Sequence, residues 1–179
     1  MARQNIGIGT TANDGTGDDL RTGAGKINDN FIELYGFTGW ISRYQGGTRL
    51  LSGATNNVIT ITGPAESNGG LVLLDADSRI TPLNLNDVIS VDFACTFVTP
   101  SGANNYVTVS IFVPTAGDYR TITIPFLKAT GIDEAFSVSF ALPVNSTFLA
   151  NGADIIITPN VDVDAKEFYI NAIRLHKGL

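Results

Sequence analysis

The feature of this sequence that most constrains its fold is an alternation of apolar and polar residues with a period of two, which recurs along most of the chain. In VISVDFACTFV, residues 88–98, the alternation places Val91, Phe93, Cys95 and Phe97 on one face of an extended strand. Two further segments each place four apolar side chains on one face: Val107, Val109, Ile111 and Val113; Phe136, Val138, Phe140 and Leu142. A strand with one apolar face must bury that face against a second layer, so the pattern predicts packed β-sheets.

Six other short segments are typical of strands, which brings the expected number to about nine. They are GWISRY, VITIT, LVLL, YRTITIPF, DIIIT and EFYINAIRL, at residues 39–44, 58–62, 71–74, 119–126, 154–158 and 167–175. The connections TPSGANN and PTAGD are short, and no helical pattern lies between strands, as a parallel crossover would need. The sequence therefore predicts a mainly β fold, an antiparallel jelly-roll-like β-sandwich over residues 37–179. An immunoglobulin-like sandwich is the alternative, which the absence of paired cysteines disfavours.

Residues 1–36 lack this alternation and are expected to form an anchoring arm with a short helix. Asn13, Asp14, Gly15 and Gly17 are residue types that favour tight turns, so a loop is predicted to end near the next residue. The arm and the sandwich are therefore predicted to be separate parts of the chain.

A helix is predicted over residues 19–35, with Asp18 as its amino-terminal cap and Asp19 placed where the helix dipole favours negative charge. Gly36 suits the left-handed position that follows the last turn. The apolar residues are spaced by four and three, as in a coiled-coil seam: Leu20, Ala24, Ile27, Phe31 and Leu34. Because so short a helix containing two glycines is weak alone, it is expected to lie on another surface.

Composition and charge argue against several classes of partner. The formal charge is -6 and the charged content is 16%, below the roughly 25% of ordinary soluble domains, so a basic nucleic-acid-binding surface is not expected. No segment approaches the length of a membrane span, and the amino terminus lacks the apolar run of a secretory signal, so synthesis in a cytoplasm is expected without a membrane partner. Cys95 is the only cysteine and is expected to be a small buried hydrophobe.

No catalytic arrangement is recognisable in the sequence. His176 is the only histidine, and no serine or cysteine motif accompanies it. The acid pairs Asp75/Asp77 and Asp162/Asp164 have the chemistry of calcium ligands but not the spacing of a calcium loop, so solvated loop acids are expected. We therefore predict no enzymatic activity, no cofactor and no metal site.

The exposed or buried state of five aromatic residues bears on whether the sandwich binds a glycan. Exposed aromatic rings stack on sugars in glycan-binding sandwiches, whereas buried rings belong to a core or a subunit interface, which we expect here. The five are Trp40, Tyr44, Tyr106, Tyr119 and Tyr169.

The segment NIGIGTTANDGTGDDLRTGAGKINDNFIELYG, residues 5–36, resembles an amino-terminal motif of tailed-bacteriophage virion proteins, including baseplate wedge, tail-fibre and head-appendage proteins. Its matching parts are the Asn-Ile-Gly start, the Asn-Asp-Gly-Thr-Gly-Asp core, Leu-Arg and the Lys-Ile-Asn-Asp-Asn-Phe-Ile-Glu-Leu-Tyr end. The extra Gly-Ile in NIGIGTT departs from the pattern. In such proteins the motif lies at the attachment end, ahead of unrelated distal domains.

The resemblance implies a structural virion protein: a homo-oligomeric, trimeric appendage or decoration subunit, on the capsid or on the tail or baseplate. It would be made in the host cytoplasm and would dock on other virion proteins through the motif. The rival hypothesis is a carbohydrate-binding module that recognises a host-surface glycan. The predicted docking and oligomer residues are Asn13, Asp14, Gly15, Gly17, Asp18, Leu20, Arg21, Ile27, Asn28, Phe31, Leu34 and Tyr35.

Overall fold

The structure is a computed structural model that describes residues 5–7, 15, 17–35, 39–68 and 71–176. The chain divides into two compact units, Met1–Thr38 and Gly39–Leu179, and the boundary predicted between residues 36 and 37 falls outside the described residues. The first unit contains α1 (Leu20–Tyr35). The second contains β1 (Trp40–Leu51), β2 (Asn57–Val58), β3 (Ala65–Asn68), β4 (Val88–Val98), β5 (Tyr106–Val113), β6 (Gly117–Pro125), β7 (Asp133–Pro143), α2 (Ser146–Asn151), β8 (Asp154–Pro159) and β9 (Val163–His176).

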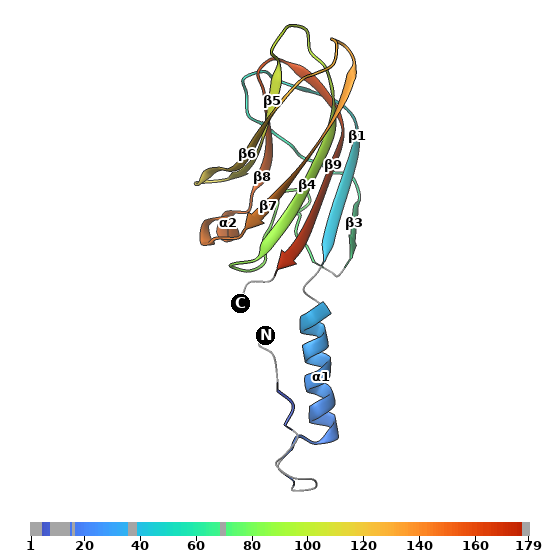
Figure 1. The fold of residues 1–179 in the computed structure, drawn as a ribbon, viewed down its shortest axis with the longest axis vertical. Helices are drawn as coiled ribbons and strands as arrows, with labels where there is room; N and C mark the ends of the chain where they lie inside the picture. Colours follow the sequence, from blue (N-terminus) through green and yellow to red (C-terminus); the bar gives the residue numbers. More distant parts are fainter. Residues whose placement is uncertain (1–4, 8–14, 16, 36–38, 69–70, 177–179) are drawn as a thin grey trace. The chain divides into compact units, whose positions relative to one another are not determined.

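The strands of the second unit form two antiparallel sheets that face each other (Figure 1). Sheet A has the strand order β3-β1-β9-β4-β7, and sheet B has the order β2-β8-β5-β6. Strands that are distant in sequence are neighbours in each sheet, because the chain crosses repeatedly from one sheet to the other. The predicted jelly-roll-like β-sandwich is confirmed.

The core lies between the two sheets and is formed by the alternating residues that the sequence singled out. On β4, Val91, Phe93, Cys95 and Phe97 are all buried, and burial raises the pKa of the Cys95 thiol. The apolar residues predicted on β5 are buried as well, and those on β7 are buried or packed against the core. Apolar burial on this scale is the main source of the stability of the sandwich.

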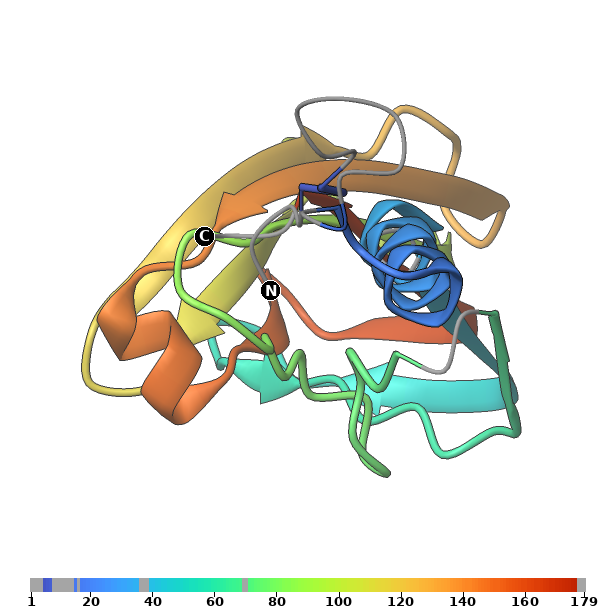
Figure 2. The same cartoon turned by 90° about the horizontal axis from the view of Figure 1, so that it is seen from below.

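A short helix that sequence periodicity missed, α2, lies at the end of the sandwich beside β7 and β8 (Figures 1 and 2). Asn145 caps it, because the Asn145 side chain accepts a hydrogen bond from the Phe148 amide at 2.8 Å. Phe148 is buried and its ring contacts that of Tyr119. Six residues are too few for a helical period to appear, so only Asn145 and the following Gly152 marked the helix.

The strand predicted at residues 71–74 is wrong. Leu73 and Leu74 are buried, but the chain turns directly after them because the Asp75 carboxylate accepts hydrogen bonds from the amides of Asp77 and Arg79, both at 2.9 Å. The edge strand is instead β3, a polar segment without an alternation signal that pairs with β1.

The strand predicted at residues 58–62 is reduced to the two residues of β2. Beyond it, one backbone bond remains, from the Ile59 amide to the Ile155 carbonyl at 2.9 Å. Side chains then bond the later residues: the Arg49 guanidinium donates to the Thr60 carbonyl at 3.0 Å, and the Gln45 side chain accepts from the Thr62 amide at 3.0 Å. The apolar alternation survives in the burial of Ile59 and Ile61.

Two neighbouring bulges, one on β1 opposite β9 and one on β9 opposite β4, interrupt strands that run longer than the sequence predicted. The pairing shifts between Gln45 and Thr48, where Gly47 has φ 90° and the facing Glu167 has φ 56°. A bulge adds one residue to the alternation. Ala165 and Phe168 therefore both point inward although they are three positions apart. This break is why residues 163–166 were not recognised as part of a strand.

A buried ion pair joins the end of β9 to the loop before β4. Arg174 Nη1 lies 3.8 Å from Asp87 Oδ2, with side-chain exposures of 5% and 0%. The Asp87 carboxylate also accepts from the Asn84 amide, and the Arg174 amide donates to the Gly39 carbonyl, at the first residue of the β unit. A buried charge without a partner is far more costly than an exposed one.

We predict that Asp87→Asn lowers the free energy of unfolding by about 3 to 5 kcal/mol, because it removes the negative charge from a buried ion pair. The matched control is Asp133→Asn, which breaks the exposed 2.7 Å pair with Lys166 and should cost at most about 1 kcal/mol. Urea unfolding followed by tryptophan fluorescence measures both. Equal losses of unfolding free energy in the two variants would contradict a larger contribution from the buried Arg174–Asp87 pair.

Candidate docking site at the amino terminus

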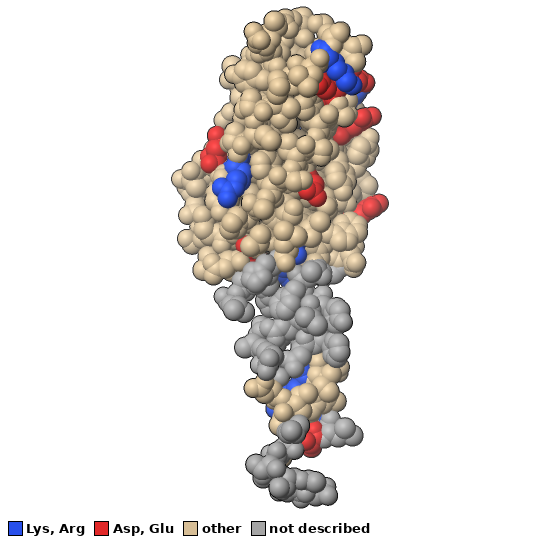
Figure 3. Space-filling model, viewed as in Figure 1, with Lys and Arg blue, Asp and Glu red and all other residues tan. Residues whose placement is uncertain are grey.

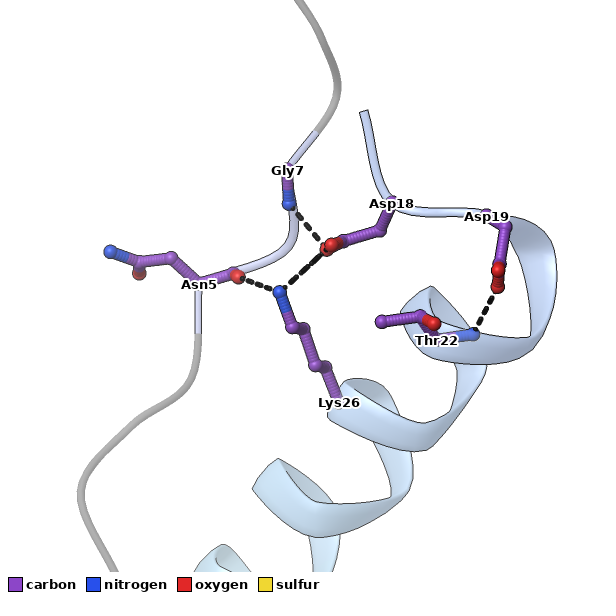
Figure 4. A network of polar contacts seen from close by, with 6 residues as sticks. All are labelled: Asn5, Gly7, Asp18, Asp19, Thr22 and Lys26. Atoms are coloured by element: carbon purple, nitrogen blue, oxygen red, sulfur yellow. Dashed lines mark hydrogen bonds and ion pairs between the residues drawn. The ribbon is translucent and has the colours of Figure 1, made fainter. Parts of the chain in front are cut away.

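The described part of the arm, residues 5–7, is attached to the start of α1 by Asp18 (Figure 4). The Gly7 amide donates to Asp18 Oδ2 at 2.7 Å, and the Asp18 amide donates to the Gly7 carbonyl at 2.8 Å. Both polar groups of the Gly7 backbone are therefore satisfied. The Gly7 backbone is thus already used within this unit.

Lys26 completes this contact from one side of α1 (Figure 4). Its ammonium donates to Asp18 Oδ2 at 2.7 Å, to Asp18 Oδ1 at 3.0 Å and to the Asn5 carbonyl at 3.1 Å. An ammonium has three N–H donors, so these contacts account for all of them. Lys26 thus fixes the arm at Asn5 while Asp18 fixes it at Gly7.

The helix cap is Asp19, one residue later than predicted. Asp19 Oδ1 accepts from the Thr22 amide at 2.7 Å, as a capping side chain does three residues into a helix. Asp18 is unavailable for capping because its carboxylate is occupied by Lys26 and Gly7. α1 accordingly begins at Leu20.

The two neighbouring acids have lowered pKa values for different reasons. The hydrogen bond from Lys26, followed by that from the Gly7 amide, holds the pKa of Asp18 below its ordinary value of 3.8. For Asp19 the hydrogen bonds from the backbone and side chain of Thr22 lower the pKa. Both groups are therefore carboxylates at neutral pH.

An open groove of about 430 Å³ lies between the arm and α1, and apolar side chains border it. Ile6 and Ile27 are 41% and 43% exposed, and Ala24 between them is also exposed. Ile6 lies against the face of α1 at Gly23, where an added Cβ would be 3.8 Å from its methyl group. The unit therefore presents a narrow apolar surface, here called the arm–helix stripe, which consists of Ile6, Ala24 and Ile27.

The predicted docking residues are described to different extents. Gly15 has φ 71°, as a turn glycine does, and Gly17, Arg21, Ile27 and Asn28 are exposed. Asn13, Asp14 and the predicted helix-ending Gly36 lie outside the described residues. Four others fall within α1, but their side chains lie outside the described part: Leu20, Phe31, Leu34 and Tyr35.

Sequence reasoning missed Lys26, Asn5 and Gly7 as members of this site. The available signal was the spacing of eight residues between Asp18 and Lys26, which places opposite charges on one side of a helix that begins just after Asp18. The backbone contacts of Asn5 and Gly7 leave no mark in residue type. Only the folded arm reveals them.

The other candidates have structural roles or no assembled site. Asp75 closes a turn, Asp162 accepts from the Gly53 amide at 2.7 Å, and within the described residues no group of three or more His, Cys, Asp or Glu is placed to hold a metal. His176 ends β9, and its side chain is outside the described part. Lys and Arg side chains do not gather on the face of the β unit seen in Figure 3. No described helix has the length and apolar character needed to cross a membrane.

We predict that Asp18→Asn releases residues 5–7 from α1, because an amide cannot replace the charge-assisted contact with Lys26. Asp19→Asn is the matched control, since asparagine is as good a helix cap as aspartate. Amide hydrogen exchange of Gly7 and Asp18 in the full chain should accelerate in the first variant and stay near the unaltered rate in the second. Equal rates in both variants would contradict the role of Asp18.

The contact is also predicted to weaken in acid. Because the folded-state pKa of Asp18 is depressed, its stabilisation is fully present above the ordinary value of 3.8 and disappears as the pH falls through the lower folded-state pKa. The Gly7 amide proton, followed by NMR, should therefore titrate with a midpoint below 3.8. Lys26→Met should move this midpoint upward, and an unchanged midpoint would rule out Lys26 as the main cause.

Residues 3–68 match the family described as Bacteriophage T4 gp9/10-like protein, N-terminal. The baseplate wedge protein gp10 of Enterobacteria phage T4 is 64% identical over 33 residues, which are 18% of this chain and 6% of that protein. The chain thus corresponds to a small fraction of that relative. The match to the amino-terminal family confirms the resemblance of the motif.

Solved structures resemble the chain in its fold. The PRD1 vertex protein P5 matches with a TM-score of 0.51 and 13% identity, over 77% of this chain and 73% of that chain. The globular domain of zebrafish complement 1qA protein matches with a TM-score of 0.48 and 9% identity, over 78% and 98% of the two chains. This chain therefore joins an amino-terminal segment similar to the bacteriophage T4 gp9/10-like family to a jelly-roll-like β-sandwich.

Proposed function

We propose that this protein is a structural component of a tailed-bacteriophage virion, docked on other virion proteins through its amino-terminal unit. The observation that carries the proposal is the arm–helix stripe: Ile6, Ala24 and Ile27 are exposed in the segment that matches the phage family. Exposed apolar side chains gathered in one place favour a protein partner. The protein is a particle subunit without enzymatic activity.

The polar contacts of the arm suit such docking. Asp18 and Lys26 hold residues 5–7 beside α1 before any partner binds, so less conformational entropy is lost on association. The weak helix, with Gly23 and Gly25 in its first turns, gains stability when its apolar seam is covered. The arm and helix thus act as one preassembled docking element.

The docked form is a homo-oligomer, with a trimer as the favoured state, because the seam from Leu20 to Leu34 has the spacing by which parallel helices associate. The β-sandwich is the distal part of this appendage or decoration subunit. The particle site is on the capsid or on the tail or baseplate, and imaging of labelled subunits on virions distinguishes them. The chain is made in the host cytoplasm before assembly.

We predict that Ile27→Asp reduces incorporation into particles, because it places a charge in the surface that docking buries. Gly25→Asp is the control: it adds the same charge to α1 where an added Cβ meets nothing within 4 Å. The amount of each variant in assembled particles is measured by mass spectrometry. A chain that lacks residues 1–36 serves as the negative control. Full incorporation of the deleted chain would refute docking through this unit.

Sedimentation of the free protein and of protein released from particles tests the trimer separately, and a monomer in both would refute self-association.

A further inference from the structure

The outer face of sheet B carries a groove of about 380 Å³ that the docking role leaves unused. Because side chains alternate along β5, Tyr106 and Thr108 point outward between its core positions, and the buried Ser110 follows them at the floor of the groove. Thr158 stands beside Thr108 on the neighbouring strand β8, and Asp118 of β6 borders the same groove. The groove is therefore built on three paired strands.

Hydroxyl groups form most of the groove's hydrogen-bonding surface. Thr108 pairs with Thr123 at 3.1 Å, and Ser110 pairs with Thr121 at 3.1 Å, between hydroxyl oxygens. The more accessible Thr108–Thr123 pair uses one of its two hydroxyl protons, so the second proton and several lone pairs are left for another molecule, whereas Ser110 is buried. Thr158 donates to Asn56 Oδ1 at 2.8 Å, a bond that does not use the Asn56 amide nitrogen. The groove thus offers donors and acceptors together.

Tyr106 adds an aromatic surface at one end of this ladder. It is 41% exposed, and its backbone is fixed by a 2.8 Å hydrogen bond from its amide to Asn160 Oδ1. Asp118 pairs with Phe112 at the other end of β5, six residues from Tyr106 and so about 20 Å along the strand. That length exceeds one sugar ring and suits a short chain of rings.

Charge limits the class of ligand. Asp118 is the single charged residue among those that line the groove, and the whole chain carries a formal charge of -6. An anionic ligand would meet repulsion without a compensating cation, whereas a neutral polyhydroxyl ligand gains an acceptor in the carboxylate. The exposed ring of Tyr106 provides a flat surface for the C–H face of a sugar.

We propose that this groove binds a neutral oligosaccharide of at least two residues, with Tyr106 stacking on one ring and the Thr108 and Thr158 hydroxyls bonding to the next. This activity is independent of docking through the arm. It also accounts for one exposed aromatic of the five considered in the sequence. Tyr44 and Tyr169 are exposed as well, but they are cross-strand neighbours on sheet A, away from the groove.

The test uses the full chain and saturation-transfer NMR with neutral disaccharides to tetrasaccharides of glucose, galactose, mannose and N-acetylglucosamine, beside a sialylated counterpart. At least one neutral oligosaccharide should bind and the sialylated one should not. Tyr106→Ala should then weaken affinity about tenfold, which corresponds to about 1.4 kcal/mol. Absence of binding across the neutral panel overturns the proposal.

Matched variants separate binding from folding. Tyr169→Ala removes an exposed tyrosine from the other sheet and should leave affinity unchanged, as should Thr48→Val on β1. Thr108→Val keeps a β-branched side chain suited to a strand but removes the hydroxyl, so it should weaken binding without unfolding the chain. Affinity that is unaffected by both Tyr106→Ala and Thr108→Val overturns the assignment of the groove. Tyr106→Ala and Thr108→Val should both be incorporated into particles normally. The docking role is tested by other variants, so its failure and the failure of glycan binding can be distinguished.

Discussion

Burial of the inward face of β4 and β9 between the two sheets is the constraint on which the β unit depends. β4 and β9 are adjacent in the middle of sheet A, and their inward residues include Phe93, Phe97, Phe168 and Ile170, all buried. Because their alternation commits one face to the core, the opposite face of each sheet is left for other purposes. The groove on sheet B exists because β5 follows the same rule.

The amino-terminal unit is organised on a different principle. Its described contacts between arm and helix are mainly polar, centred on Asp18 and Lys26, while its apolar side chains at Ile6 and Ile27 are exposed. A unit with its polar groups satisfied internally and its apolar groups outside is suited to association. The two parts of the chain therefore differ: the β unit buries its apolar side chains between its own sheets, whereas the amino-terminal unit leaves Ile6 and Ile27 exposed.

The sequence predicted most of the sandwich because period-two burial is strong in β4, β5 and β7. It failed where local hydrogen bonding overrode apolar patterning, as at Asp75, which turns the chain after Leu74. It also failed at Glu167, where a bulge interrupts the alternation. In the candidate docking site, residue types identified the turn at Gly15, but not the backbone of Gly7, since a main-chain contact depends on the fold and not on the side chain.

The edges of the two sheets bear on how copies of this sandwich behave when they lie close together. β2 has two residues and β3 has four, so each offers few unpaired backbone groups. The longer edge strands β6 and β7 both end in proline, at Pro125 and Pro143, which has no amide proton to donate to an added strand. Short or proline-ended edges resist strand addition between neighbouring copies. Dense display of this sandwich is therefore compatible with individually separate domains that do not merge into continuous sheets.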